Sequence, residues 1–457
     1  MKYHIVTLGC PKNAVDSEGM DGILAAAGHT HAASVVDADV IIVNTCSFIA
    51  AARDETIDVL CDLGASKRAG QRLIAAGCMA QSHADLVSGV AGVDATLGTQ
   101  QWTRIGELVG PGRSPHARDI PLIGLDLVTK PSAPPSSPDT PRSYADWRTA
   151  PIRRSRSTPS AYLKISDGCN LRCAFCTIPS FKGAMASKPI HAILAEAQEL
   201  AARGVREIVL VAQHLTDYGH DLALADGLAT LLDELCQVLP ANIWLRLMYA
   251  YPHGISERLI AVMAARPQIL TYLDMPLQHA HPDTLRRMRR PPDADRTREI
   301  IRDLRAAMPD IAVRSTFIVG FPGETSAEFQ ALLGFLDEMR LDRVGAFRYS
   351  QEPGTYAATL PGQVRPQVIE NRWHELMQLQ QGISHERSQR WLGRTIDVLI
   401  EGRGSAGDGR QVALGRSFRD APEVDGQVFV WGEPPVGEIV AVRVTQATDY
   451  DLWGEAV

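Results

Sequence analysis

The cysteines of this chain carry its clearest chemical signal. Cys169, Cys173 and Cys176 stand in one short run with the spacing C-x3-C-x2-C. Three thiolates on one tight loop can ligate three irons of a four-iron cluster, which leaves the fourth iron open to a small-molecule ligand. No His or Cys follows within the loop to complete a zinc site. The spacing therefore predicts an iron–sulfur cluster with one open coordination position.

A second set of three cysteines is spread over the first 80 residues. Cys10, Cys46 and Cys78 each follow a short apolar run by one or two residues, at separations of 36 and 32 residues. Such separations suit one βαβ unit each, and the carboxyl ends of parallel strands share one edge of a sheet. We therefore expect these thiols to converge on a second cluster, with three merely buried cysteines as the alternative. Cys61 and Cys236 fall at helical core spacing and are predicted to pack in the interior.

The elements that must position these cysteines predict an α/β fold. Residues 1–112 alternate short apolar runs with amphipathic stretches, as expected for a parallel α/β domain. Its candidate strands are Tyr3–Leu8, Val40–Asn44, Leu73–Ala76 and Ala95–Leu97.

Three further segments complete the predicted organisation. Residues 113–157 are rich in Pro and Ser and are expected to form a linker. Residues 158–387 contain six βα units, which predicts a partial (βα)6 barrel with the C-x3-C-x2-C loop after its first strand. Residues 388–457 consist of short strands broken by Gly and Pro, and they predict a small antiparallel β-barrel.

Composition narrows the class of protein. The 457 residues are 45% hydrophobic and 22% charged, with a formal net charge of −7, so no general basic surface is available for nucleic acid or anionic membranes. The longest apolar runs fall far short of the ~20 residues needed to cross a bilayer, and the start of the chain lacks a secretory signal pattern. We expect a cytoplasmic location, where reduced thiols serve as metal ligands rather than disulfides.

Weaker signals surround the predicted barrel mouth. A Gly320-Phe321-Pro322-Gly323 turn ends one strand, where its glycines would let a ligand approach the backbone; an ordinary strand-to-helix turn is the alternative. Gln213 at a strand end and Arg314 within a strand are candidates for cofactor binding. Arg314 would suit a cofactor carboxylate, although a supporting role is equally consistent.

The C-x3-C-x2-C loop resembles that of the radical-SAM superfamily. By that resemblance, the open iron would bind S-adenosylmethionine (SAM), which an electron from the cluster cleaves to a deoxyadenosyl radical. Phe175 would then lie beside the adenine, although simple packing under the loop is compatible with its position.

Three longer motifs make the resemblance specific. The runs Thr7–Glu18, Ala161–Cys169 and Pro276–Ala280 look like those of methylthiotransferases, which insert sulfur and a methyl group at an unactivated C–H bond. The resemblance covers nearly the whole chain apart from the linker. It implies two 4Fe-4S clusters, one on each cysteine set, and an electron donor such as flavodoxin or ferredoxin.

This family has two branches, one acting on a transfer-RNA adenosine and the other on the β-carbon of an aspartate in small-subunit ribosomal protein S-twelve. The opening Leu8–Asn13 and the tail segment Leu414–Gly426 look like the ribosomal-protein branch. The terminal barrel resembles the module called TRAM, which contacts RNA in the other branch.

Charge tests the choice between the branches. From residue 390 to the end the chain has seven Arg, no Lys and eleven Asp or Glu, a formal charge of −4. Such a barrel would repel RNA phosphates and suits a basic protein partner, with a merely solvated acidic face as the alternative. We therefore expect no direct nucleic-acid binding, and the remaining alternatives are the transfer-RNA enzyme and a noncatalytic iron–sulfur sensor.

The chain departs from the usual pattern of the ribosomal-protein branch at four positions. His214 and Leu215 replace a common Asp-Thr pair, while Lys182 and Lys188 replace common arginines. Lysine keeps the charge but loses the bidentate geometry of arginine, so contacts at these two positions are in question.

Overall fold

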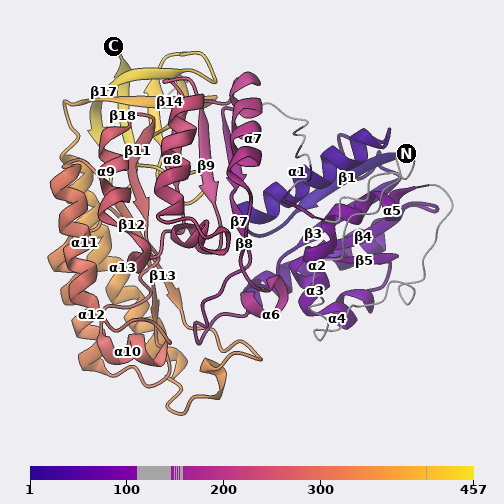
Figure 1. The fold of residues 1–457 in the computed structure, drawn as a ribbon, viewed down its shortest axis with the longest axis horizontal. Helices are drawn as coiled ribbons and strands as arrows, with labels where there is room; N and C mark the ends of the chain where they lie inside the picture. Colours follow the sequence, from indigo (N-terminus) through magenta and orange to yellow (C-terminus); the bar gives the residue numbers. More distant parts are fainter. Residues whose placement is uncertain (111–145, 149, 151, 153, 155–157, 408) are drawn as a thin grey trace. The chain divides into compact units, whose positions relative to one another are not determined.

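The computed structural model describes residues 1–110, 146–148, 150, 152, 154, 158–407 and 409–457, so most of the predicted linker lies outside the described residues. Two compact units are present (Figure 1). The first comprises Met1–Ser155 with Ser180–Lys182, and the second comprises Arg156–Pro179 with Gly183–Val457.

The first unit is built on a five-stranded sheet in the order β2-β1-β3-β4-β5, and every pairing is parallel. The predicted strands are present, and a short edge strand, β2, joins them. The strands are β1 (Lys2–Thr7), β2 (Thr30–His31), β3 (Val40–Thr45), β4 (Arg72–Gly77) and β5 (Ala95–Gly98). The helices are α1 (Pro11–Ala26), α2 (Ala50–Ser66), α3 (Cys78–Ser82), α4 (Ala84–Ser88) and α5 (Ile105–Val109).

Alternation along the strands creates a separate core on each face of this sheet. Ile42 and Ile74 face one side, where α1 and α5 contribute Leu24 and Ile105. Their neighbours in the strands face α2, α3 and α4 on the other side. Both faces are thus covered, as a parallel sheet requires.

The second unit contains a six-stranded parallel sheet in the order β6-β9-β10-β11-β12-β13, which confirms the predicted α/β class. Its strands are β6 (Ser160–Lys164), β9 (Glu207–Val211), β10 (Trp244–Leu247), β11 (Ile269–Asp274), β12 (Ala312–Val319) and β13 (Arg343–Arg348). A two-stranded sheet, β7 (Ser166–Asp167) and β8 (Ala186–Ser187), follows β6. Its helices are α7 (Ile190–Ala202), α8 (Gly227–Val238), α9 (Glu257–Ala265), α10 (Pro282–Arg287), α11 (Ala294–Ala307), α12 (Ser326–Met339) and α13 (Pro366–Gln389). The short helix α6 (Ile178–Lys182) begins in the second unit, and its last three residues belong to the first.

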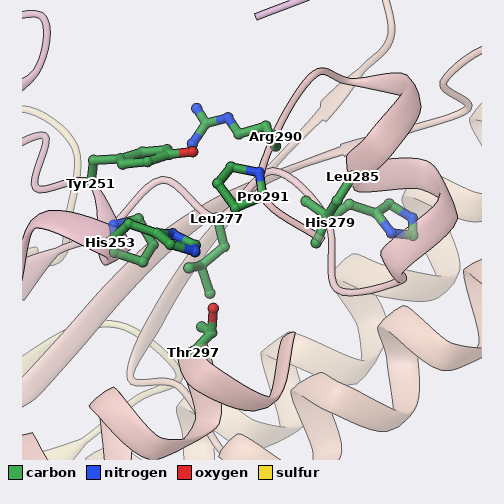
Figure 2. Close-up of a pocket in the computed structure, with 9 residues that line it drawn as sticks. Tyr251, His253, Leu277, His279, Leu285, Arg290, Pro291 and Thr297 are labelled. Carbon is green, nitrogen blue, oxygen red and sulfur yellow. The ribbon is translucent and has the colours of Figure 1, made fainter. Parts of the chain in front are cut away.

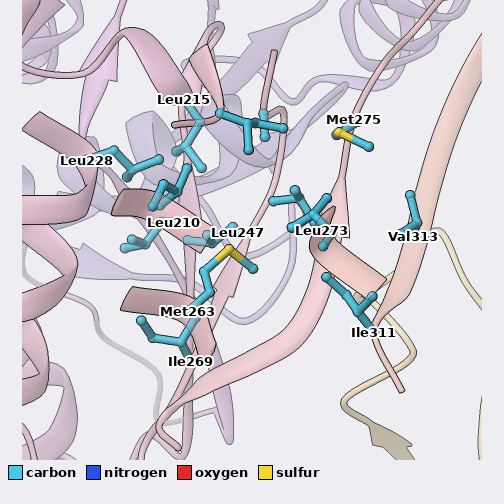
Figure 3. Close-up of a cluster of buried hydrophobic side chains, with 14 of the residues drawn as sticks. Leu210, Leu215, Leu228, Leu247, Met263, Ile269, Leu273, Met275, Ile311 and Val313 are labelled. Atoms are coloured by element: carbon cyan, nitrogen blue, oxygen red, sulfur yellow. The ribbon is translucent and has the colours of Figure 1, made fainter. Parts of the chain in front are cut away.

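The outer face of this sheet packs against its helices and forms the largest core of the molecule. Leu210, Leu247, Leu273 and Val313 come from four neighbouring strands and are fully buried together with Met263 of α9 (Figure 3). This continuous apolar layer holds the strand ends, and therefore the loops that follow them, in fixed positions.

The chain ends in a closed five-stranded barrel in the order β14-β15-β16-β18-β17. Its strands are β14 (Thr395–Ser405), β15 (Gln411–Ser417), β16 (Val428–Trp431), β17 (Ile439–Ala447) and β18 (Leu452–Ala456). The neighbours pair antiparallel as predicted, except that β16 and β18 pair in parallel. Closure needs this last strand, β18, which the alternation pattern did not reveal.

The terminal barrel packs against the inner face of the six-stranded sheet. Leu399 and Ala421 join Val209 and Tyr272 of that face in one buried cluster. The tail segment that resembles the ribosomal-protein branch therefore serves as an internal contact, and Ala421 is completely buried.

Charged side chains also connect the terminal barrel with the inner face of the six-stranded sheet, and we call this contact the seam. The Arg246 Nε donates to Glu207 Oε1 at 2.6 Å, and its Nη1 donates to the Phe418 carbonyl at 2.7 Å. Arg416 pairs with the other oxygen of Glu207, and Arg343 pairs with Asp420 at 2.6 Å. A buried charge is tolerated only when it is paired, so these contacts fix the terminal barrel in one orientation.

Within the part of the chain that the structure describes, no helix is both long and apolar enough to cross a membrane.

Candidate metal and cofactor sites

The structure brings Cys10, Cys46 and Cys78 together at the carboxyl edge of the first sheet. They follow β1, β3 and β4, which are neighbours in the sheet. A Cβ placed on Gly9 would lie 2.8 Å from the Cys46 Sγ, so only glycine lets the Cys10 loop pass so close to the second cysteine. The predicted convergence of the three thiols is confirmed.

Asn13 ties the three strand ends together. Its Nδ2 donates to the carbonyls of Leu8 and Thr45, both at 3.0 Å, and its Oδ1 lies 3.5 Å from the Cys78 Sγ. Asn44 returns a hydrogen bond to the Asn13 carbonyl at 2.8 Å. These buried amides fix the strand ends beside the thiols before any metal binds.

Burial dominates the protonation of these thiols. It raises the pKa of Cys78 to about 12, with Lys182 opposing the shift and Cys10 and Cys46 adding to it. Burial also raises the pKa of Cys46, where Cys10 again contributes. Burial thus favours the neutral forms of Cys46 and Cys78, and a cationic metal centre would stabilise the thiolates that ligation needs.

The second set, Cys169, Cys173 and Cys176, lies on the loop that follows β6 and β7. The Cys169 N–H donates to the Gly183 carbonyl at 3.2 Å, and the Cys176 N–H donates to the Cys173 carbonyl at 3.1 Å. Gly168 has φ +81°, and a Cβ there would lie 2.3 Å from the Ala184 carbonyl oxygen. The left-handed turn at Gly168 is therefore what starts this loop.

Asp167, which directly precedes Gly168, anchors the start of the same loop. One carboxylate oxygen accepts from the Gly168 N–H at 3.0 Å and from Gln213 Nε2 at 2.7 Å. The other accepts from Lys164, a fully buried ammonium, at 3.1 Å. This carboxylate links the end of β6, the end of β9 and the cysteine loop.

The thiols of this loop also influence one another's pKa values. Burial raises the pKa of Cys176 to about 12, while Cys173 and Cys169 add to the shift and Arg290 opposes it. Burial also raises the pKa of Cys169, where Arg290 again acts in the opposite direction.

A single metal ion fits neither trio. Tetrahedral zinc–sulfur bonds of about 2.3 Å would bring the sulfurs within roughly 4 Å of one another. Among the described residues, the one group whose ligand atoms lie within 4.8 Å of each other is His281, Asp283 and Glu328. Glu328 in that group already pairs with Arg287 at 2.8 Å and closes a capping box with Thr325, so it is engaged in structure.

The barrel mouth beside the loop offers buried polar atoms that lack a hydrogen-bond partner within the described part of the chain. They are Ser166 Oγ, Gln213 Oε1, both ring nitrogens of His214 and Arg290 Nε. Burying polar atoms without partners is costly, so a polar ligand at this mouth would stabilise them. The donor and acceptor set fits a nucleoside carrying an amino acid, which SAM is.

Each residue predicted to bind the cofactor has a definite position. Phe175 packs edge-on against Phe321 at 6.5 Å, and Gln213 donates to Asp167. Arg314 donates to Asp274 at 2.7 Å and lies 3.4 Å from Asp425, so two carboxylates already engage its guanidinium. Contact of these three residues with the cofactor stays a prediction.

The departures from the family pattern are accommodated locally. His214 packs edge-on against Tyr251 at 5.1 Å, and burial lowers its pKa to about 4, so its ring is neutral near pH 7. Lys188 pairs with Glu196 at 2.6 Å, and Lys182 lies 3.4 Å from Asp16.

The structure differs from the prediction for Cys61 and decides between the two interpretations of the Gly-Phe-Pro-Gly turn. Cys61 is exposed rather than packed, because α2 buries only a narrow face around Thr56 and Leu60, whereas Cys236 is buried as predicted. At the Gly-Phe-Pro-Gly turn, a Cβ on Gly320 would lie 2.3 Å from Ile369 of α13. Gly320 therefore makes room for α13, which favours the interpretation of this segment as an ordinary strand-to-helix turn.

The sequence patterns did not single out three residues at these sites. Asp167 and Asn13 lie inside the recognised motifs, and a search for polar residues beside the cysteines would have found them. Arg290 stands in an arginine-rich stretch without any distinguishing pattern.

Comparison with protein families agrees with this geometry. Residues 163–336 match the radical SAM superfamily, residues 392–457 match the TRAM domain, and residues 2–98 match an uncharacterized protein family, UPF0004. The partial barrel with its three-cysteine loop thus defines a radical-SAM enzyme that carries an additional N-terminal domain and a terminal TRAM barrel.

Full-length relatives identify the family. The chain is 73% identical to a ribosomal protein uS12 methylthiotransferase RimO from Chloroflexus aurantiacus, with all of both chains covered. It is 44% identical to the RimO of Moorella thermoacetica, over 100% of this chain and 99% of the relative. This chain belongs to the RimO family of ribosomal protein uS12 methylthiotransferases.

A solved structure shares the fold. The radical SAM methyltransferase TsrM from Kitasatospora setae, with cobalamin and a [4Fe-4S] cluster bound, aligns with a TM-score of 0.56. The alignment covers 78% of this chain and 73% of that one at 16% identity, so it supports the architecture alone.

Proposed function

We propose that this chain transfers a methylthio group to the β-carbon of an aspartate in ribosomal protein uS12. The observation that carries the proposal is the presence of two separate cysteine trios, each at the carboxyl edge of its own parallel sheet, in a chain similar to RimO over its whole length. One trio suits radical generation, and the second gives a separate metal centre from which sulfur can be delivered.

The two trios would hold two 4Fe-4S clusters, and SAM would bind at the loop cluster. When bound, these groups supply hydrogen abstraction from an unreactive C–H bond, sulfur transfer and methylation. The chain itself supplies position: Asp167 holds the loop, and Asn13 holds the N-terminal edge. An electron donor such as flavodoxin or ferredoxin would be needed, and the reduced thiols suit a cytoplasmic location.

The charge of the terminal barrel supports a basic protein as substrate. Two of its seven arginines, Arg416 and Arg419, are buried, and so is Asp420, while the Asp425 side chain is 2% exposed. The exposed barrel surface therefore keeps an acidic excess, which suits a basic protein and disfavours RNA. Exposed acids of the barrel include Asp397, Glu401, Glu423, Glu433, Glu438 and Glu455.

Two variants of the full-length protein test the cluster assignment. Replacing Cys10, Cys46 and Cys78 by Ala is expected to halve the iron bound after anaerobic reconstitution and to abolish the methylthio product, while the loop cluster remains. Replacing Cys169, Cys173 and Cys176 should remove the other half and all SAM cleavage. Cys61→Ala, at an exposed thiol, serves as the matched control and should change neither.

The substrate is tested by mass spectrometry of uS12 and of transfer RNA from cells that lack the gene. Loss of a methylthio mass on one aspartate of uS12 is expected. Loss from a transfer-RNA adenosine instead would show that the other branch is correct, and unchanged iron content in both triple variants would refute the two-cluster assignment.

A further inference from the structure

Arg290 differs from the other buried or half-buried arginines around the barrel mouth. Arg287, three residues earlier, pairs with Glu328, and Arg372 pairs with Glu324. Arg290 forms an ion pair with none of the carboxylates in the part of the chain that the structure describes, and its Nε is buried without a hydrogen-bond partner. Its Nη1 donates to the Pro276 carbonyl at a long 3.3 Å, and its guanidinium also forms a side-chain hydrogen bond with Tyr251.

The guanidinium group of Arg290 is held in place by aromatic rings. It lies 4.6 Å from the centroid of the Tyr251 ring and 5.9 Å from that of Phe175, the residue before the last cysteine of the loop. Figure 2 shows the guanidinium directed toward the Tyr251 hydroxyl group. These contacts orient the group, and its Nε still has no hydrogen-bond partner among the described residues.

The backbone places this guanidinium beside the cysteine loop. The Ala174 N–H, within the loop, donates to the Met288 carbonyl at 2.9 Å, and the Arg290 N–H donates to the Leu285 carbonyl at 2.8 Å. The charge of Arg290 consequently acts on Cys169 and Cys176 as well as on His214. A half-buried cation that has an unpartnered Nε and no carboxylate partner among the described residues calls for an anion.

We propose that Arg290 is the carboxylate-binding residue of this mouth. This inference rests on the proposed function, which brings two carboxylates to the loop: that of the methionine part of SAM, and that of the substrate aspartate, attached to the carbon that reacts. The planar fork of arginine can bind either one through two parallel hydrogen bonds, an arrangement that lysine cannot provide.

The experiment measures equilibrium binding to the full-length protein, reconstituted anaerobically and kept without reductant so that no turnover occurs. The variants are Arg290→Gln and Arg290→Lys. Arg286→Gln is the matched control, since it makes the same charge change four residues earlier, in an exposed pair with Asp283. Iron content and circular dichroism establish that each variant is folded and loaded.

Two binding arms distinguish the sources of the carboxylate. In the first, the wild-type protein should prefer SAM to its decarboxylated analogue, and Arg290→Gln should lose SAM affinity by roughly ten- to a hundredfold together with that preference. In the second, a uS12 peptide containing the target aspartate is compared with its Asn counterpart. A loss of the same size confined to the aspartate peptide would assign Arg290 to the substrate. Arg290→Lys should recover only part of either loss.

Loss in either arm supports the proposal, and unchanged affinity in both arms for a folded, loaded Arg290→Gln variant overturns it. A shift in the reduction potential of the loop cluster without any loss of affinity also overturns it, because Arg290 would then act on the cluster alone. Failure of the wild-type protein to modify uS12 would instead refute the proposed function, and the SAM arm would still decide the role of Arg290.

Discussion

Glu207 offers a quantitative test of how the terminal barrel is held on the partial barrel. Its carboxylate is fully buried between Arg246, which is also fully buried, and Arg416, which is 4% exposed. Glu207→Gln keeps the shape but removes the negative charge, which leaves two buried guanidinium groups without it. Removing one partner of a buried ion pair costs about 3–5 kcal/mol.

The lower end of that range is expected here. Arg416 keeps Glu401, and Arg246 keeps the carbonyls of Phe418 and Ser417. We therefore expect a loss of about 3 kcal/mol in the free energy of unfolding, measured by urea denaturation of the apo protein at pH 7. Glu438→Gln serves as the control, since this exposed residue pairs with Arg206 at 3.4 Å, and it should change stability by less than about 0.5 kcal/mol.

The pH dependence of the free energy of unfolding tests the same ion pairs independently. Burial by itself raises the pKa of Glu207, but Arg246 and Arg416 outweigh burial and hold the pKa at about 2, below its ordinary value. A carboxyl group with a lowered folded-state pKa stabilises the fold above its unfolded pKa of about 4.3, and this stabilisation is lost as the pH falls toward the folded value. The difference between wild type and Glu207→Gln should be complete above about pH 5 and shrink below it. A difference under about 1 kcal/mol at pH 7, or one independent of pH, would refute this account of the seam.

Two further predictions concern the barrel mouth. Asp167→Asn should weaken the anchor of the cysteine loop and slow deoxyadenosine release in a single turnover by roughly ten- to a hundredfold, because small misplacements at a reacting centre are costly. An unchanged rate at equal iron content would contradict the anchoring role. Gly320→Ala should destabilise the fold by about 1–3 kcal/mol in thermal unfolding, since φ is +77° and the added Cβ would press on Ile369. Gly334→Ala is the control and should not destabilise the fold, because no atom lies within 4 Å of the added Cβ on α12.

Much of the candidate site could be predicted because its signals are local. The spacing of Cys169, Cys173 and Cys176 fits a single loop, which needs no knowledge of distant residues. The convergence of Cys10 with the other N-terminal cysteines follows from strand periodicity together with the shared edge of a parallel sheet.

Some details escaped because local patterns do not contain them. The sequence predicts an antiparallel terminal barrel but does not reveal the parallel pairing of β18 with β16, since a closed barrel selects partners by geometry rather than by turn signals. Cys61 fits a helical stripe in sequence, but the stripe that α2 buries is narrower than periodicity suggests.

The sequence by itself predicted which residues would hold metal and determined which strands precede them, because both depend on spacing along the chain. Only the tertiary structure decided that Arg416 and Ala421 of the tail segment are buried against the six-stranded sheet, with Arg246, Glu207 and Arg416 brought together from three separate parts of the chain. It also decided that Arg290 faces the cysteine loop without a carboxylate partner among the described residues. The physical reason is that pairing of charges depends on distance in space, and in the chain Arg290 lies more than a hundred residues from the loop whose thiols feel its charge.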